Sequence, residues 1–437
     1  MAMRDRFLPA LLLAAVALPA GAQDLLVRAG HVLDVETGRM LPARDILVRD
    51  GRIVSITPRA NAADPGLRAL DWSALTVVPG LMDMHTHLAD EGPYGDPATP
   101  LRSNAARDAF IGARNARATL QAGFTTVRDV GVYRGFADVQ LRDAVNAGLV
   151  PGPRMFVAGA YVTVTGGGGE ITGLPAGTGV PDTFRRGIAD DAAEVRRRVN
   201  EILDAGADFI KLIATGAVLA DGTEPGQSEY TEAQIRAAVE EAERRGSFVA
   251  AHAHGAEGIK RAVRAGARSI EHGSLMDDEA IALMKQHGTW LVADIYNDDY
   301  ILAEFGRLNY PQKILDKERL VGRTQRENFR KAAKAGVKIA YGTDAGVYPH
   351  GWNGKQMAKM VEWGLTPMQA IVSATSSAAT LLGWQQNVGR IAPGLYADLI
   401  AVAGDPLKDV GEFEHVTFVM KGGVVYKQDG QALARAP

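Results

Sequence analysis

Histidines and carboxylates gather at the ends of short apolar runs. The first group is His85-Thr86-His87, which closes a run that begins near Leu75. Side chains two residues apart on a strand share a face, so both imidazoles would point the same way, as a metal site requires. A single histidine there would more often be a satisfied core residue, whereas the pair favours metal binding.

Similar groups close later apolar runs. They are His252-Ala253-His254, Glu271-His272 and Asp344. Imidazole and carboxylate donors at one edge of a sheet suit zinc or another borderline divalent ion. The sequence contains no cysteine, which excludes thiolate ligands and disulfide bonds.

Lys211 lies inside the apolar run Phe209–Ile213. An unpaired buried ammonium is costly, so the lysine must lose its charge or find a partner. Two interpretations stay open. The lysine forms a salt bridge across the fold, or CO₂ carboxylates Nζ and gives an anion able to bridge two divalent ions.

The elements that must position these residues follow a repeated pattern, in which a helical stretch ends at a glycine and an apolar strand follows. The glycines are Gly123, Gly206, Gly246, Gly266, Gly288 and Gly336. Glycine suits the left-handed position after a helix. With the runs Leu75–Met84 and Arg154–Ala160 the pattern gives eight strands, which predicts an α/β fold of the (β/α)₈ TIM-barrel type over residues 80–384. Polar residues at the carboxyl ends of such strands are the catalytic candidates.

Both ends of the expected mature chain are rich in β-formers. Asp50-Gly51 separates two alternating runs and predicts a hairpin. Residues 23–79 and 385–437 are therefore expected to build one small β-sandwich domain together.

The first 22 residues have the pattern of a signal peptide. Arg4 and Arg6 precede the apolar run Leu8–Leu18, and Ala20-Gly21-Ala22 gives an A-x-A cleavage site. The run is too short to span a membrane. We expect export to the periplasm or the medium after cleavage near Ala22.

Composition points to small-molecule chemistry. The net charge of −3 gives no basic footprint for nucleic acid or an anionic membrane. No G-x-G-x-x-G follows the first strand and no Walker A loop is present. The glycine run Thr165–Gly169 lacks lysine, so we interpret it as a flexible loop and not as a phosphate cradle.

Taken together, these residues resemble the amidohydrolase superfamily, binuclear branch. The segment Gly389–Ile400 adds to the likeness, which covers nearly the whole mature chain. Within the superfamily the chain is similar to the imidazolonepropionase-like and Xaa-Pro dipeptidase group, and more narrowly to bacterial amidohydrolases that hydrolyse ochratoxin A. The resemblance implies two divalent ions, with zinc expected, and a homo-oligomer, an octamer being one form. The implied ligands are His85, His87 and Asp344 for one ion, His252 and His272 for the other, and carboxylated Lys211 as the bridge.

The expected reaction is hydrolysis of an amide bond in an N-acyl amino acid or dipeptide-like substrate, such as ochratoxin A cleaved to ochratoxin alpha and phenylalanine. Two divalent ions lower the pKa of a shared water and supply a bridging hydroxide. Asp344 can carry the proton to the leaving nitrogen, or it can serve as a ligand only. The alternatives are an Xaa-Pro dipeptidase or carboxypeptidase, a lactonase or phosphotriesterase, a mononuclear deaminase and a binding protein without activity.

Several further residues are candidates around the barrel mouth. Tyr230 precedes a capping box formed by Thr231 and Gln234, so a structural role and a substrate contact are both open. His254 and Glu271 are expected to orient the metal ligands. The other candidates for substrate contact are His254, Tyr133, Tyr161 and His350, with Arg128 a weaker one. Gly168 stands where relatives often have histidine, which suggests a roomier pocket.

Overall fold

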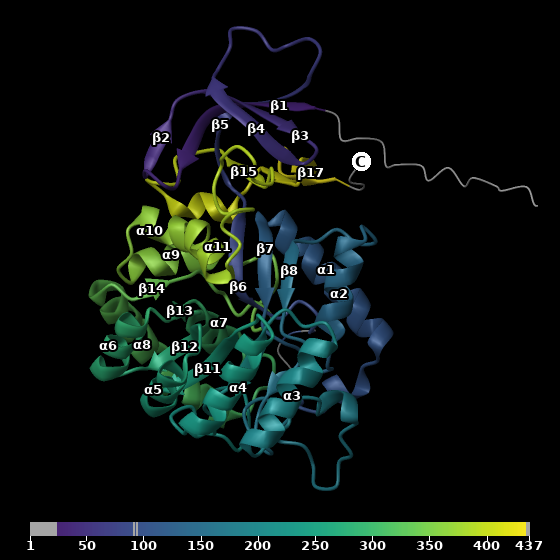
Figure 1. Cartoon of the computed structure of the whole chain (residues 1–437), viewed down its shortest axis with the longest axis vertical. Helices are drawn as coiled ribbons and strands as arrows, with labels where there is room; N and C mark the ends of the chain where they lie inside the picture. The colour runs from purple at the N-terminus through teal and green to yellow at the C-terminus, as the bar shows by residue number, and fades with distance from the viewer. Residues whose placement is uncertain (1–23, 91, 93–94, 434–437) are drawn as a thin grey trace, which may run out of the picture.

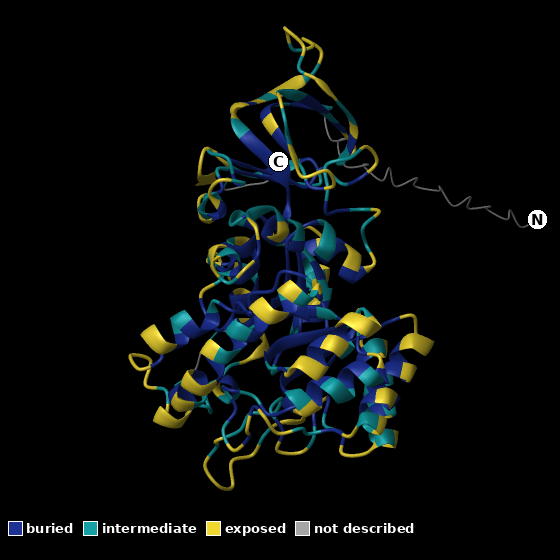
Figure 2. Ribbon diagram, turned by 90° about the vertical axis from the view of Figure 1, so that its left-hand side faces the viewer, coloured by how far each residue is buried: buried dark blue, intermediate teal, exposed yellow. Residues whose placement is uncertain are grey.

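The computed structural model describes residues 24–433 except 91, 93 and 94, and it consists of a helix-covered barrel with a sheet against one end (Figure 1). The helices expose their outer faces, while the strands inside are buried (Figure 2). The predicted signal peptide lies outside the described residues. No helix in the described part combines the length and apolar character that a membrane span requires.

Strands from both ends of the chain form one nine-stranded sheet, as predicted. The N-terminal strands are β1 (Leu25–Asp34), β2 (Arg39–Leu41), β3 (Arg44–Arg49), β4 (Arg52–Pro58) and β5 (Arg68–Pro79). The C-terminal strands are β15 (Leu399–Val402), β16 (Phe418–Lys421), β17 (Val424–Gln428) and β18 (Gln431–Ala432). β5 joins the two sets, because it pairs with β1 on one side and with β15 on the other. The predicted hairpin connects β3 to β4, and Asp50 and Gly51 have φ values of 48° and 74°, as a type I′ turn requires.

The two halves of this sheet pack around one apolar core. Val27 from the N-terminal half and Leu399 and Met420 from the C-terminal half belong to the same buried cluster. Trp72 is 1% exposed, and its ring centroid lies 5.0 Å from that of Phe418. This packing fits the small sandwich expected from the sequence, although a continuous path of hydrogen-bonded strands links both halves.

Eight strands, all parallel to their neighbours, build the barrel, and this confirms the predicted (β/α)₈ architecture. They are β6 (Leu81–Thr86), β7 (Phe124–Asp129), β8 (Arg154–Val157), β10 (Ile210–Ile213), β11 (Val249–Gly255), β12 (Ser269–Leu275), β13 (Trp290–Val292) and β14 (Lys338–Ile339), with the short β9 (Tyr161–Val162) beside β10. Backbone hydrogen bonds close the ring where the ladders stop. Met84 N donates to Tyr341 O at 2.8 Å, and Asp208 N donates to Val157 O at 2.8 Å.

The sequence analysis was wrong about the first barrel strand, because the run Leu75–Met84 divides at Gly80. β5 belongs to the chain-end sheet and β6 to the barrel. A Cβ at residue 80 would lie 2.2 Å from Oγ1 of Thr125 on β7, so only glycine lets the chain pass this close. Arg154, at the start of β8, also pairs with Asp398 of the sheet at 3.0 Å. The sheet therefore sits at the amino ends of the barrel strands, and their carboxyl ends point away from it.

The helices cover the barrel and end largely where the glycine pattern predicts. They are α1 (Ala105–Gln121), α2 (Ala137–Asn146), α3 (Ala192–Asp204), α4 (Glu232–Arg244), α5 (Ala256–Ala265), α6 (Asp278–His287), α7 (Asn297–Glu304), α8 (Gln312–Ala335), α9 (Lys355–Glu362), α10 (Pro367–Ser373) and α11 (Ser376–Leu382). The short 3₁₀ helices are η1 (Pro100–Arg102), η2 (Asp182–Phe184) and η3 (Val410–Glu414). Gly266, Gly288 and Gly336 cap α5, α6 and α8 in the left-handed conformation, with φ of 100°, 69° and 81°.

Candidate metal centre at the barrel mouth

A cavity of about 230 Å³ opens at the carboxyl ends of the barrel strands. All six residues that the sequence analysis proposed as metal ligands line it, namely His85, His87, Lys211, His252, His272 and Asp344. They come from β6, β10, β11, β12 and the loop after β14. The fold thus brings together side chains that are up to 259 positions apart in the chain.

The first donor group combines His85 of β6 and His87, the residue directly after β6, with Asp344, and one donor atom of each lies within 4.8 Å of the others. Asp344 Oδ1 is 3.1 Å from His87 Nε2 and 3.5 Å from His85 Nε2. Burial opposes protonation of His87, but its hydrogen bond to Asp344 and the negative charge of that carboxylate raise the pKa of His87 to about 9. Asp344 has a φ of 56°, a left-handed backbone that aspartate tolerates better than most residues.

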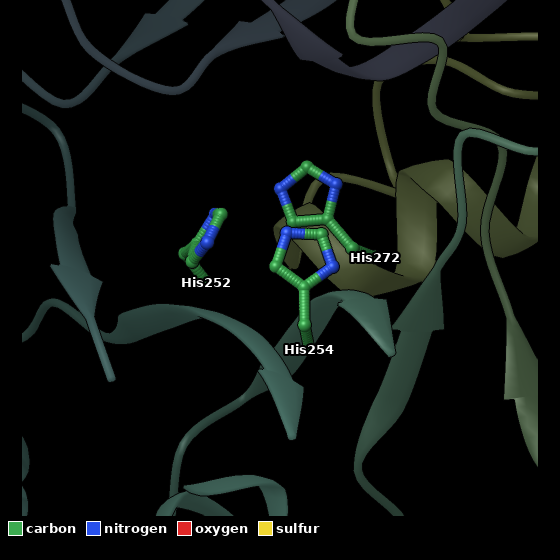
Figure 3. Close-up of side chains that lie close together, drawn as sticks. All are labelled: His252, His254 and His272. Carbon is green, nitrogen blue, oxygen red and sulfur yellow. The ribbon is translucent and has the colours of Figure 1, made fainter. Parts of the chain in front are cut away.

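The second donor group contains His252, His254 and His272, whose donor atoms also lie within 4.8 Å of one another. Figure 3 shows the three rings converging, and the rings of His254 and His272 stack with centroids 4.7 Å apart. The Nδ1 atom of His254 is 2.8 Å from the hydroxyl of Ser274. His254, expected to orient the ligands, thus lies beside them as a donor in its own right.

Lys211 lies in the same cavity and is 2% exposed. No described carboxylate is within ion-pairing distance of its Nζ, so the salt bridge considered from the sequence is not formed in the described part of the chain. Burial lowers the pKa of Lys211 to about 8, against the opposing charge of Glu271. A lysine without a partner at this position agrees with carboxylation of Nζ, which stays a prediction.

Hydrogen bonds fix the rings of His85 and His87. His87 Nδ1 donates to the carbonyl of Gly131 at 2.8 Å, and because a carbonyl can only accept, Nε2 is left facing Asp344. His85 Nδ1 is 2.9 Å from Glu271 Oε2. Arg128, fully buried beneath the site, donates to the other oxygen of Glu271 at 2.6 Å. Glu271 thus has the geometry expected of a residue that orients a ligand.

His272 is held in the same way by a residue that the sequence analysis missed. Its Nδ1 lies 2.9 Å from Asp294 Oδ1, and Gln325 donates to that same oxygen at 2.9 Å. Asn297 donates to Asp294 at 2.6 Å and to Asp344 at 3.1 Å, which ties the two carboxylates together. Asp294 follows β13 by two residues, so the rule that polar residues at strand ends are candidates could have found it.

The donors present fit divalent ions. Nε2 of His252 is buried and has no hydrogen-bond partner, a costly state that a bound cation would relieve. Burial and the neighbouring imidazole of His272 lower the pKa values of His252 and His254 well below the usual value for histidine. Both rings are therefore neutral, which is the form that binds metal. Imidazole and carboxylate donors suit zinc and similar ions.

Tyr133 and Tyr161 line the cavity as expected for substrate contacts. Their rings meet edge to face with centroids 5.9 Å apart. The Tyr161 hydroxyl lies 3.1 Å from His87 Nδ1. Both tyrosines can present a hydroxyl beside the first donor group, and their contact with substrate stays a prediction.

Two other candidates do not line the cavity. Tyr230 is fully buried in the barrel core, where its hydroxyl donates to Ala189 O at 2.7 Å, and the capping box that follows it is present. The structure therefore favours the structural role for Tyr230. His350 lies behind the β6 histidine pair, with Nε2 3.2 Å from His87 O and Nδ1 3.4 Å from the hydroxyl of Thr119. Because these contacts use both ring nitrogens, His350 supports the backbone of His87.

Gly168 lines the cavity, and its loop packs closely against a neighbouring segment. A Cβ at this residue would lie 3.1 Å from the backbone nitrogen of Ala217, so the glycine lets the loop approach the segment after β10. The backbone N–H of Gly168 donates to Glu229 at 2.8 Å, which holds the loop in place. The roomier pocket expected from the sequence stays a prediction.

Comparison with known proteins gives consistent matches over most of the chain. Residues 76–426 match the Amidohydrolase family. The chain is 34% identical over 372 residues to ochratoxinase from Aspergillus niger, with 81% of this chain and 76% of the fungal protein covered. It is 26% identical over 442 residues to imidazolonepropionase from Symbiobacterium thermophilum, with 94% and 95% covered.

Solved structures match over similar lengths. The structure of a Xaa-Pro dipeptidase with methionine bound in its active site gives a TM-score of 0.86 at 37% identity, with 92% of this chain and all of that chain covered. The structure of Aspergillus niger ochratoxinase gives 0.82 at 30% identity, with 93% and 96% covered.

Proposed function

The chain belongs to the amidohydrolase family and is a hydrolase of amide bonds, and from this premise we propose that it cleaves N-acyl amino acids or dipeptide-like amides with two divalent ions. Ochratoxin A, cleaved to ochratoxin alpha and phenylalanine, is the proposed test substrate. The 34% identity to a fungal ochratoxinase supports this choice.

One observation carries the proposal. The donor groups at the barrel mouth overlap, because His272, Asp294 and Asp344 form a third group that shares His272 with one neighbour and Asp344 with the other. The donors therefore form a continuous band and not one isolated site. A band of this kind suits two adjacent cations better than one.

We propose that His85, His87 and Asp344 hold one ion and His252 and His272 the other, with zinc as the metal and carboxylated Lys211 between them. When bound, such ions lower the pKa of a water molecule and polarise a carbonyl oxygen. His254 offers a further nitrogen donor beside the second ion. Glu271 and Asp294 keep the Nε2 atoms of His85 and His272 turned toward the cavity.

Asp344 is proposed as the proton carrier. Its carboxylate reaches the centre of the donor band, and Asn297 keeps it in position. Water adds its oxygen to the amide carbon, the C–N bond breaks, and Asp344 passes a proton from the water to the leaving nitrogen. A carboxylic acid and an amine result, which balances the atoms of water and amide. Tyr133 and Tyr161 are proposed to contact the substrate beside the first donor group.

A second candidate is an Xaa-Pro dipeptidase or carboxypeptidase activity at the same site. The 37% identity and the TM-score of 0.86 to a Xaa-Pro dipeptidase favour it. A lactonase or phosphotriesterase would keep both ions and differ only in substrate. A mononuclear deaminase would bind one ion and would not need Lys211.

Export and assembly are also proposals. Cleavage near Ala22 predicts that the mature N-terminus begins at Gln23, which N-terminal sequencing of secreted protein would test. A homo-oligomer, with an octamer as one form, is tested by light scattering. The proposed domains, residues 23–79 with 385–437 and residues 80–384, are tested by limited proteolysis.

A substrate panel tests the proposed function. Purified, zinc-loaded protein is incubated with ochratoxin A, Xaa-Pro dipeptides, other N-acyl amino acids, a lactone and a phosphotriester, and products are quantified by chromatography. We expect release of phenylalanine from ochratoxin A or of the C-terminal residue from dipeptides. Cleavage of the lactone or phosphotriester alone would contradict the proposal.

A further inference from the structure

The loop after β10 contains a strap, residues 217–223, that borders the cavity. Four residues of the strap line the cavity, namely Ala217, Val218, Leu219 and Ala220. Leu219 also packs against an apolar cluster that includes Ile301 of α7 and Leu315 of α8. The strap therefore connects the end of β10 with the side of the cavity that α7 and α8 form.

Backbone contacts fix the base of the strap to the rest of the loop. Thr215 and Ser228 form an isolated antiparallel bridge. Gly216 N donates a hydrogen bond to Gln227 O at 3.0 Å. A movement of the strap would pivot about this base.

A hydrogen bond closes the strap on itself. The backbone N–H of Ala217 donates to the hydroxyl of Thr223 at 3.2 Å, and Thr223 is 6% exposed. Because this bond joins the first residue of the strap to the last, we expect the strap to move as one unit.

Side chains of α8 hold the outer part of the strap. Lys317 donates from Nζ to the carbonyl of Ala220 at 2.9 Å and also to the carbonyl of Thr223. Lys313 Nζ lies 2.5 Å from Asp221 Oδ1. Flexible lysine side chains make these contacts, whereas backbone pairing holds the base. The strap can thus leave α8 without disturbing the barrel.

The two lysines differ in how strongly they hold the strap. The side chains of Lys313 and Asp221 are 54% and 35% exposed, and such exposed ion pairs contribute little to stability. Lys317 is half-buried, and its hydrogen bonds come from a charged donor, which makes them stronger than neutral ones. Lys317 is therefore the main attachment of the strap to α8.

The cavity is small for the proposed substrates. Its volume is about 230 Å³, whereas sites for drug-sized ligands occupy roughly 300–1,000 Å³. Hydrogen-bonded ladders hold the barrel strands that carry the donor groups, so this part of the wall is rigid. A loop held by a few side chains opens at a much lower cost in free energy. The strap is therefore the part of the wall that can make room.

We propose that the strap opens away from α8 to admit bulky amides, and that Lys317 keeps it closed. The choice of amides rests on the proposed function, whereas the opening itself does not. Small amides fit the closed cavity and depend less on the opening.

Labelling of a single thiol measures the opening. The chain contains no cysteine, so Ala220→Cys introduces a lone thiol at a position that is 7% exposed. The protein is treated with dithiobis(nitrobenzoate), a bulky aromatic disulfide, and the labelling rate is followed by absorbance. Loss of a hydrogen bond from a charged donor changes an equilibrium constant by roughly 10- to 100-fold. We expect Lys317→Met, added to Ala220→Cys, to raise the labelling rate by this factor.

Matched variants show whether the effect belongs to Lys317. Lys331 is an exposed lysine of the same helix, away from the cavity lining, and Lys331→Met should leave the labelling rate unchanged. Lys317→Arg keeps a charged donor and should label at nearly the unmodified rate. If Lys317→Met does not fold, Lys317→Gln replaces it, because the shorter neutral side chain also loses the charged contact. An unchanged labelling rate in the folded variant would overturn the proposal.

Matched substrates test the opening during the reaction. Ochratoxin A and N-acetylphenylalanine share the phenylalanine leaving group and differ in the size of the acyl group. In Lys317→Met we expect the ratio of kcat/KM for ochratoxin A to that for N-acetylphenylalanine to rise by about 10-fold or more. Any common effect on the chemical step cancels in this ratio. An unchanged ratio would overturn the role of the strap in admitting bulky amides.

The two measurements distinguish this proposal from the proposed function. Faster labelling in Lys317→Met, without hydrolysis of either amide, would support the opening and refute amide hydrolysis. Hydrolysis of both amides, with a labelling rate and a ratio that do not depend on Lys317, would do the reverse. The absence of hydrolysis together with an unchanged labelling rate would refute both.

Discussion

The barrel mouth and the chain-end sheet bury very different side chains. At the mouth His85, Lys211, Glu271 and Asp294 are all at most 5% exposed. The core of the sheet is apolar, with Trp72 at its centre. Burying polar groups costs free energy that apolar burial regains. The apolar core of the sheet therefore stabilises the fold, whereas the buried polar groups at the barrel mouth lower its stability and provide the candidate metal ligands.

The two regions nevertheless touch. β5 continues into β6 through Gly80, and Arg154 pairs with Asp398 across the boundary. Whether the sheet affects only stability and the barrel mouth mainly turnover therefore has to be tested by substitutions in each region. We order these by their expected effect on turnover.

The largest effect is expected from Asp344→Asn. Asparagine is isosteric and tolerates the φ of 56°, so the fold should persist. Loss of the proton carrier should lower kcat/KM by about 10²- to 10⁴-fold. Activity is measured on the best amide of the panel, and circular dichroism checks the fold. Full activity would refute the assigned role.

Lys211→Ala should come next. It removes the proposed bridge, so both the metal content and the rate should fall, the rate by about 100-fold. Metal per chain is measured by plasma mass spectrometry after dialysis, beside the kinetic assay. An unchanged content of two ions would count against a bridging lysine.

Glu271→Gln should have an intermediate effect on turnover and should also lower stability. The neutral amide of this variant would orient His85 less well, which predicts a loss of about 10- to 100-fold in activity or metal affinity. Arg128 would lose its charged partner in the core, which predicts a free energy of unfolding lower by about 3–5 kcal/mol. Urea denaturation and metal titration measure the two effects.

A matched control for that variant is Glu257→Gln on α5. Glu257 is exposed and pairs with Arg261 at 2.8 Å. We expect neither quantity to change measurably there, because exposed pairs contribute little. Equal losses of activity and stability in both variants would mean that neither effect depends on the buried position of Glu271.

Trp72→Ala should have the smallest effect on turnover and a large one on stability. The cavity left in the sheet core should lower the free energy of unfolding by about 3–5 kcal/mol. The kcat/KM of the folded fraction should stay within about twofold, because the cavity lining contains no residue of the sheet. A folded variant with a large loss of turnover would show that the sheet core also affects turnover.

The sequence allowed the barrel and six residues that line its mouth to be predicted, because strand ends are marked by local patterns; that these six bind metal stays a prediction. Glycine after each helix and a period of two within strands mark the strand ends, and the strand ends converge in a barrel. The predicted domain boundary fell at residue 80, but the division of the run Leu75–Met84 into two strands escaped because the apolar run continues through Gly80. What separates β5 from β6 is the close approach of Thr125, a contact between distant segments.

The parts that could not be predicted are those that depend on which side of an element faces the cavity. Tyr230 and His350 lie in segments that connect a strand to the next helix, but Tyr230 turns into the core and His350 lies behind His87. Glu318 lies in the amphipathic helix α8, and only packing decides that it lines the cavity at the barrel mouth and does not face solvent. Such orientation is set by tertiary contacts that no local pattern contains.

The layer of Arg128 and Glu271 beneath His85 makes the barrel a well with a solid floor. Under the proposed function, substrate would enter and both products would leave through the same opening. This geometry predicts a preference for small amides and chain ends over internal bonds of folded polypeptides.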